Sequence, residues 1–149
     1  MPALTDIRCS IAHSLEVLGQ KWTILIVRDA MRGRTRFADF KASLGVAPDI
    51  LADRLNSLVD NGIFERRSYR DEGSREREEY VLTDAGRALL PVLAALNAWG
   101  DEYRPNEQGP ATLYTEAASG DPVRLAFVAA DGRELPMADV AAVQGPGAL

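Results

Sequence analysis

Apolar residues recur at helical spacing near the start of the chain and predict two helices over 11–19 and 21–33. In the first, Ile11, Leu15 and Leu18 share one face, and Gly19 ends the helix as a C-terminal glycine does. Residues 22–27 are nearly all apolar, which predicts a buried helix ending at Gly33. The short run "TILIV" alone would also suit a buried strand, but the periodic continuation favours a helix.

The segment "TRFADFKASLG" predicts a third helix. Thr35 is the expected N-cap. Phe37, Phe40 and Leu44 recur at i, i+3 and i+7, so they form one apolar face, and Gly45 ends the helix.

The segment "VAPDILADRLNSLVDNG" predicts a fourth helix. Pro48 suits the first helical position, and Asn61-Gly62 marks the end. The buried stripe is expected at Leu51, Leu55 and Leu58. Two short helices joined by a glycine-containing turn are typical of a helix-turn-helix, although the pattern alone is weak because many helical proteins share it.

A dense run of charge follows, in which eleven of the sixteen residues from Glu65 to Tyr80 are aspartate, glutamate or arginine. Composition alone is typical of a disordered linker. The flanking runs "IFERRSY" and "REEYVLT" instead alternate like strands, and Gly73 between them suits a turn. A helix-turn-helix followed at once by a β-hairpin predicts a mainly α winged helix-turn-helix fold with a small β-hairpin wing.

The segment 83–103, "TDAGRALLPVLAALNAWGDEY", predicts one long helix that Thr83 or Asp84 caps and Pro91 bends. Its apolar surface is broader than one neighbouring helix can cover, which favours a dimer interface. Packing against the first helix of the same chain is the alternative.

Proline and glycine punctuate residues 104–112, which we expect to be a linker. Asp131-Gly132 between apolar runs predicts a hairpin, so 113–149 should be a small C-terminal β-appendage with a mobile end at "GPGAL". The domain division that follows is a winged-helix domain at 9–103 that includes the expected dimer surface, a linker, and this extension.

Composition narrows the class of protein. The chain has 149 residues, of which 46% are hydrophobic, enough for a real core. It has no apolar run long enough for a membrane span and no secretion signal, so we expect a cytoplasmic protein with no membrane partner. One cysteine and one histidine argue against an intrachain disulfide and a metal site. No paired nucleophile and base and no phosphate-binding glycine loop occurs, so neither an enzyme nor a cofactor is expected.

The net charge of −5 argues against nucleic acid only at first sight. Lysine plus arginine balances aspartate plus glutamate over residues 1–100. Residues 101–149 carry eight acids and three arginines, which account for the whole excess. The body of the chain can therefore still present a basic face.

Several motifs occur together in one order: Cys9, "GQKWTILIVRDAMRG", "RTRFADF", "ILADRL", "LVDNGIFERR", "YVLTDAGR" and Trp99. Over residues 9–103 the chain resembles the HxlR-type branch of the MarR-like winged-helix transcriptional regulators. The resemblance implies a homodimer that binds an operator in double-stranded DNA and represses or activates transcription, with dimer contacts from the N-terminal and the long C-terminal helices.

The chain departs from that family at two places. The hairpin tip reads "EGSRERE" where relatives often have prolines, and the fourth helix begins with Ala47-Pro48-Asp49 where many have Ser and Gln. The acidic tail is shared only with longer relatives, and its role does not carry over.

Winged-helix proteins place the second helix of the motif in the major groove. With the leucines inward, the outward positions are Pro48, Asp49, Ala52, Asp53 and Asn56, and Arg54 lies beside the buried stripe but can reach out. The residues expected to contact DNA are Pro48, Asp49, Ala52, Arg54 and Asn56. Arg54 suits a guanine edge or a phosphate, and Asn56 a base or backbone contact. Asp49 could accept from a cytosine amine, but it could equally stabilise the positive end of the helix dipole without touching a base.

Phosphate contacts are expected from two groups of arginines. The first, Arg32, Arg34 and Arg36, stands before the third helix. The second is the wing group Arg66, Arg67, Arg70, Arg75 and Arg77, of which we expect two to touch DNA, with Arg75 best placed for the minor groove. Because six acids accompany five arginines in Glu65–Tyr80, specific arginines must be presented while others pair within the hairpin.

Two further groups of side chains could serve regulation. Cys9, beside Arg8, is a candidate redox sensor, but a small apolar residue at a dimer seam is the competing reading. The aromatic residues Trp22, Phe37, Trp99 and Tyr103 could line a small-molecule effector pocket, although such residues at helical spacing are more often core. We therefore expect a sequence-specific DNA-binding transcriptional regulator that acts as a repressor; the alternative is a winged-helix protein-interaction module with an acidic docking tail.

Overall fold

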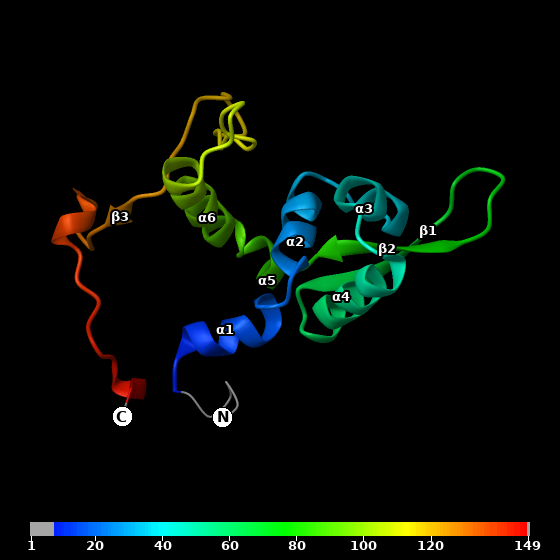
Figure 1. The fold of residues 1–149 in the computed structure, drawn as a ribbon, viewed down its shortest axis with the longest axis horizontal. Helices are drawn as coiled ribbons and strands as arrows, with labels where there is room; N and C mark the ends of the chain where they lie inside the picture. Colours follow the sequence, from blue (N-terminus) through cyan, green and yellow to red (C-terminus); the bar gives the residue numbers. More distant parts are fainter. Residues whose placement is uncertain (1–7, 149) are drawn as a thin grey trace. The chain divides into compact units, whose positions relative to one another are not determined.

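Within residues 8–148, five helices and a two-stranded hairpin form the first of two units into which the chain divides (Figure 1). The boundary between the units lies between Leu89 and Leu90. The computed structural model describes residues 8–148. In chain order the elements of this unit are α1 (Ser10–Leu18), α2 (Thr23–Met31), α3 (Phe37–Leu44), α4 (Pro48–Asp60), β1 (Phe64–Tyr69), β2 (Arg77–Leu82) and α5 (Asp84–Arg87). The predicted winged helix-turn-helix order is confirmed.

The core of the first unit lies where α2, α3 and α4 meet the base of the hairpin. The predicted stripe of α4 is buried, with Leu51, Leu55 and Leu58 at most 1% exposed. Phe40 of α3 and Phe64 of β1 are equally buried, and their ring centroids lie 6.2 Å apart. Burial of these side chains, rather than helix propensity, holds such short helices in place.

The start of α2 differs from the prediction. Trp22 was expected inside the helix, but it is the N-cap and has a φ of 79°, the one positive φ outside glycine among residues 8–148. A left-handed backbone cannot continue a right-handed helix, so α2 begins at Thr23. The amide of Thr23 donates to the carbonyl of Gln20 (3.2 Å), which closes the turn from α1.

The predicted N-cap of α3 is also wrong. Arg36, not Thr35, is the N-cap residue, and it makes no side-chain capping bond. Thr35 instead donates its hydroxyl hydrogen to the Oε2 of Glu79 (2.6 Å), and its carbonyl accepts from the amide of Tyr80 (2.7 Å). Because both partners lie in β2, Thr35 joins the helix-turn-helix to the hairpin.

The hairpin has the predicted strands and turn. β1 and β2 pair antiparallel from Phe64 opposite Leu82 to Tyr69 opposite Arg77. Gly73 in the connecting loop has a φ of 73°, the left-handed conformation that glycine adopts without strain. Figure 1 shows the ribbon extending beyond the helices to a rounded tip, so the charged run is a wing and not a linker.

The long helix predicted over 83–103 is interrupted. Thr83 caps α5 by accepting from the amide of Gly86 (3.1 Å), as predicted, but α5 ends at Arg87 and α6 (Leu90–Tyr103) begins after two turn residues. Pro91 lacks an amide hydrogen, and its ring would clash with the carbonyl four residues earlier, which belongs to Arg87. The proline therefore separates two helices instead of bending one.

The second unit consists of α6 and the C-terminal extension. The extension contains an isolated bridge between Thr115 and Pro122 and the small hairpin of β3 (Phe127–Val128) and β4 (Glu134–Leu135). The predicted Asp131-Gly132 turn joins these strands, and the φ of Gly132 is 87°. The hydroxyl of Tyr114 donates to the Oδ1 of Asn97 (2.7 Å), which ties the extension to α6.

The end of the extension carries two 3-10 turns, Met137–Asp139 and Pro146–Ala148. The mobile end predicted for "GPGAL" falls partly on this second turn and partly on Leu149, which lies outside the described residues. None of the helices within residues 8–148 is both long enough and apolar enough to cross a membrane.

Candidate nucleic-acid interface

The second helix of the motif presents a polar face opposite its leucines. Gly45, with a φ of 63°, ends α3, and buried Val46 anchors the turn into α4. Of the positions predicted to face DNA, Pro48, Asp49 and Asn56 are exposed, and Ala52 is half-buried. This face is free to enter a groove because the core lies on the other side of the helix.

Asp49 and Arg54 differ in how much of each side chain is exposed and can therefore contact a base. Asp49 is exposed in the first turn of α4, a position that suits both a base contact and the helix dipole. Arg54 is half-buried, and its Nε is enclosed without a hydrogen-bond partner among residues 8–148. Only the remaining guanidinium nitrogens of Arg54 are therefore available to DNA.

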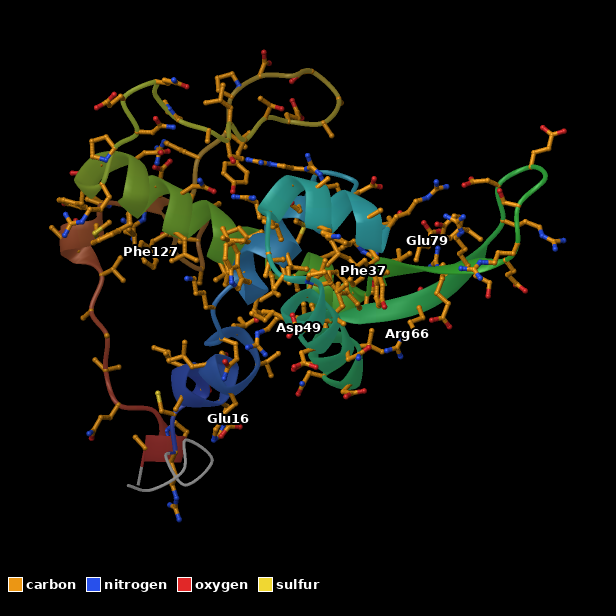
Figure 2. The ribbon with its side chains drawn as sticks, turned by 45° about the vertical axis from the view of Figure 1, so that its right-hand side comes forward. Glu16, Phe37, Asp49, Arg66, Glu79 and Phe127 are labelled. Atoms are coloured by element: carbon orange, nitrogen blue, oxygen red, sulfur yellow. The ribbon has the colours of Figure 1, made fainter. Side chains whose placement is uncertain are left out.

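Asn56 is engaged by the wing. The Nη2 of Arg66 donates to the Oδ1 of Asn56 (2.5 Å), and the same guanidinium lies 3.8 Å from Glu78 and over the ring of Tyr80. Figure 2 shows Arg66 on the strand beside α4. This contact fixes the orientation of the Asn56 amide and leaves its NH₂ group to donate to a nucleic acid.

The other wing arginines fall into two groups. Arg67 pairs with Glu65 on the same strand (2.6 Å), and Arg70 donates to the carbonyl of Ser74 across the loop (2.9 Å). Arg75 and Arg77 are exposed, and within residues 8–148 neither has an ion-pair partner. Within residues 8–148, Arg75 and Arg77 are therefore the wing arginines that make neither an ion pair nor a side-chain hydrogen bond, and both follow Gly73.

The arginines before α3 are less free than the sequence indicated. Arg36 makes two hydrogen bonds to Asp71 (2.9 and 3.2 Å) and lies over the Tyr69 ring, 4.2 Å from its centroid. The hydrogen bond to Asp71 raises the pKa of Arg36 above its ordinary value. Arg36 therefore braces the wing loop while its charge is largely compensated.

Arg34 approaches a buried acid that sequence analysis missed. Asp29 of α2 is fully buried, pairs with neighbouring Arg28 (2.8 Å), and lies 3.9 Å from Arg34. The amide of Arg34 also donates to the carbonyl of Asp29 (3.1 Å). One signal could have identified this acid: an aspartate that interrupts an apolar helix beside an arginine is usually paired when buried. Arg32, the third member of the group, is exposed at the C-terminus of α2.

The candidate regulatory residues belong to different parts of the chain. Cys9 is exposed at the N-cap of α1. Trp22 and Phe37 are half-buried in the first unit, whereas Trp99 and Tyr103 are more than half exposed on α6 in the second. Trp99 and Tyr103 line a pocket of the second unit.

Comparison with known proteins gives consistent results. Residues 17–108 match the family described as HxlR-like helix-turn-helix. The chain is similar to Rv3095 of Mycobacterium tuberculosis (strain ATCC 25618 / H37Rv), described as an uncharacterized HTH-type transcriptional regulator. The two are 36% identical over 139 residues, which cover 93% of this chain and 87% of the relative.

Solved structures agree. PA1607, a candidate transcription factor, superposes with a TM-score of 0.77 at 40% identity over 92% of this chain and 95% of that one. The redox regulator HypR in its reduced form gives a TM-score of 0.57 at 30% identity, over 64% of this chain and 94% of HypR. The likeness to PA1607 therefore includes the extension, whereas the likeness to HypR covers a smaller share of the chain.

Proposed function

This chain belongs to the HxlR-like helix-turn-helix family of DNA-binding transcriptional regulators, and we propose that it represses transcription as a homodimer. It is not an enzyme. In the proposed complex α4 enters the major groove of the operator, and the wing follows the neighbouring backbone or minor groove. The observation that carries this assignment is the exposure of Arg75 in the wing loop and of Arg77 at the start of β2, neither of which has an ion-pair partner within residues 8–148.

The proposed contacts divide by role. Arg75 and Arg77 bind phosphate or the minor groove and supply the salt-dependent part of the affinity. Pro48, Asp49, Ala52 and Asn56, with the outer nitrogens of Arg54, lie on the face of α4 that reads base edges. Arg36 and Arg66 mainly position the wing and Asn56, because each is already bound to another residue.

Exposed apolar residues on two helices, α6 and α1, support the proposed dimer. On α6 the residues Val92, Leu96, Trp99 and Tyr103 repeat at intervals of four, three and four, and they are 42–56% exposed. On α1, Ile11 and Leu15 are 70% and 47% exposed. Heptad-spaced apolar stripes of this kind bury themselves in coiled-coil contacts. A second copy of the chain presents the same stripe, so a symmetric dimer buries the stripes of both copies against each other.

A thiol response is the proposed regulation, and Cys9 supports it. The side chain is exposed at the start of α1, one of the two helices proposed to form the dimer. The likeness to HypR, described as a redox regulator, supports the same reading. Since Cys9 is the one cysteine of the chain, its oxidation joins two copies or adds a small thiol.

The test is a mobility-shift titration of the full-length protein against its own promoter and the adjacent divergent promoter, repeated over a series of salt concentrations. The proposal expects a specific complex whose affinity falls steeply as salt rises, since each neutralised phosphate releases counterions. Transcription in vitro from the bound promoter should decrease when the protein is added. Absence of any salt-dependent complex would favour the protein-interaction module, and an increase in transcript would make the protein an activator.

A further inference from the structure

Asn56 and Arg66 form a contact between the second helix of the motif and the wing. Asn56 is exposed on the face of α4 that points away from the buried leucines, and Arg66 lies on β1 beside this helix (Figure 2). The Nη2 of Arg66 donates to the Oδ1 of Asn56 (2.5 Å). Because a guanidinium only donates hydrogen bonds, the amide oxygen of Asn56 must face Arg66, and its NH₂ group must point elsewhere.

Arg66 is held in this position from two further sides. Its Nε lies 3.8 Å from the Oε2 of Glu78, and its guanidinium lies over the ring of Tyr80, 5.9 Å from the ring centroid. Tyr80 is the strand partner of Arg66 and is itself fixed, because its amide donates to the carbonyl of Thr35 (2.7 Å). The wing therefore sets the orientation of the Asn56 amide in the absence of DNA.

This arrangement changes which base Asn56 can read. An asparagine with a free amide pairs with adenine by accepting from the N6 amine and donating to N7. Here Arg66 competes with that amine for the same oxygen, and its positive charge repels the amine hydrogens of adenine and cytosine. Guanine instead presents two acceptors side by side, N7 and O6. The NH₂ group of Asn56 and the remaining N–H groups of Arg66 are donors, so they match guanine.

We propose that Asn56 and Arg66 act together to read a guanine in the major groove of the operator, with Asn56 contacting the base and Arg66 positioning its amide. The inference rests on the proposed entry of α4 into that groove and adds the identity of one base. The competing interpretation is a bond that only joins the wing to α4. Both side chains are exposed, and exposed contacts of this kind add little to stability, so variants that lack the bond should still fold.

Selection of binding sites from a duplex library with a randomised segment, read by sequencing, tests the proposal with the full-length protein. The position that Asn56 reads is the one whose base preference Asn56→Ala reduces most. We expect the wild-type protein to prefer guanine over adenine there by about tenfold. Arg66→Met keeps a long side chain but donates no hydrogen bond, so it should reverse this preference to adenine by about tenfold. Arg124→Met, which removes an arginine of the extension paired with Glu134, should leave the preference unchanged.

The double variant separates positioning from direct contact. Because Arg66 acts through Asn56, Arg66→Met should not alter the preference at this position when Asn56→Ala is already present. A guanine preference that depends on Arg66 in that background would assign the base to Arg66 itself and overturn the inference. A weaker complex of Arg66→Met with an unchanged guanine preference would reduce the bond to a tether, with the same consequence.

The selection also distinguishes this inference from the proposed function. A wild-type protein that selects a specific site but prefers adenine at the Asn56 position, or has no position that depends on Asn56, would overturn the inference and leave the proposed function standing. A library from which the protein selects no site would contradict both.

Discussion

Arg36 and Asp71 lie 35 positions apart in the sequence, yet two hydrogen bonds of 2.9 and 3.2 Å join them. The pair connects the residue before α3 to the loop of the wing, and Tyr69 lies against the same guanidinium. The sequence predicts that Arg36 contacts DNA and that Asp71 lies in a turn. In the structure, Asp71 holds the Arg36 side chain.

Removing that acid should strengthen binding to DNA of unrelated sequence. In Asp71→Ala the Arg36 charge is released toward phosphate, so the slope of log affinity against log salt should steepen by about one unit. Fluorescence anisotropy with a labelled duplex measures this. Glu72→Ala removes a neighbouring exposed charge without releasing an arginine and serves as the control. If the two variants behave alike, Arg36 does not act through its bond to Asp71.

Arg75 and Arg77 should contribute more to DNA binding than Arg67. Each of the first two is unpaired in the structure, whereas Arg67 is bound to Glu65. Arg75→Ala and Arg77→Ala should each weaken operator binding and reduce the salt slope by about one unit, and Arg67→Ala should have a smaller effect. Unchanged operator affinity and slope in Arg75→Ala would remove that residue from the interface.

Gly86 should be intolerant of a side chain. A Cβ at this position would meet the carbonyl oxygen of Ile63 at 2.3 Å and the Leu82 side chain at 2.8 Å, whereas nothing lies within 4 Å at Gly100 of α6. Gly86→Ala should lower the free energy of unfolding by about 1–3 kcal/mol. Gly100→Ala should raise it by up to about 1 kcal/mol. Urea denaturation compares the two, and equal effects would contradict the close packing at Gly86.

Leu96→Glu should convert the proposed dimer to a monomer. The substitution places a charge in the middle of the exposed apolar stripe of α6, and burying an unpaired carboxylate opposes association. Size-exclusion chromatography with light scattering measures the mass. Leu113→Glu, at a position 78% exposed in the extension, should leave the dimer intact. A monomeric wild-type protein would exclude the stripe as a dimer seam.

Oxidation of Cys9 should alter DNA binding. Diamide takes two electrons and two protons from two thiols, so a disulfide between two copies is expected on a non-reducing gel, together with loss of the operator complex. Cys9→Ser should show neither change. If alkylation of Cys9 by N-ethylmaleimide leaves operator binding unaltered and diamide has no effect, the cysteine is a structural residue of α1.

The local pattern of the sequence was sufficient to predict the helices of the helix-turn-helix and the strands of the wing. The leucine stripe of α4 and the glycine turn of the wing were predictable because burial follows the helical repeat and because positive φ favours glycine. These signals lie within a few residues of one another, so no knowledge of the tertiary fold is required to read them.

The contacts that shape the interface were not predictable in this way. Thr35 has a side chain suited to an N-cap, but its hydroxyl donates a hydrogen bond to Glu79, 44 residues later. Pairing of Arg36 with Asp71 and of Arg66 with Asn56 likewise depends on how the wing approaches α3 and α4. Composition revealed that some wing arginines must be neutralised; the fold decides which ones.

The hydrogen bond from the Tyr80 amide to the Thr35 carbonyl attaches the base of the wing to the helix-turn-helix, so the wing is anchored at one end. The base is held by Thr35 and by Thr83, whose amide and hydroxyl donate to the chain next to Phe64. The loop of seven residues between the strands is held by the Arg36 and Arg70 bonds and by the hydrogen bond from the Ser74 amide to the Asp71 carbonyl. Bending should therefore increase toward Arg75. If the wing contacts DNA as proposed, its base keeps a fixed position while its tip follows grooves of different width, and we expect the same fold to accept operators of different shape.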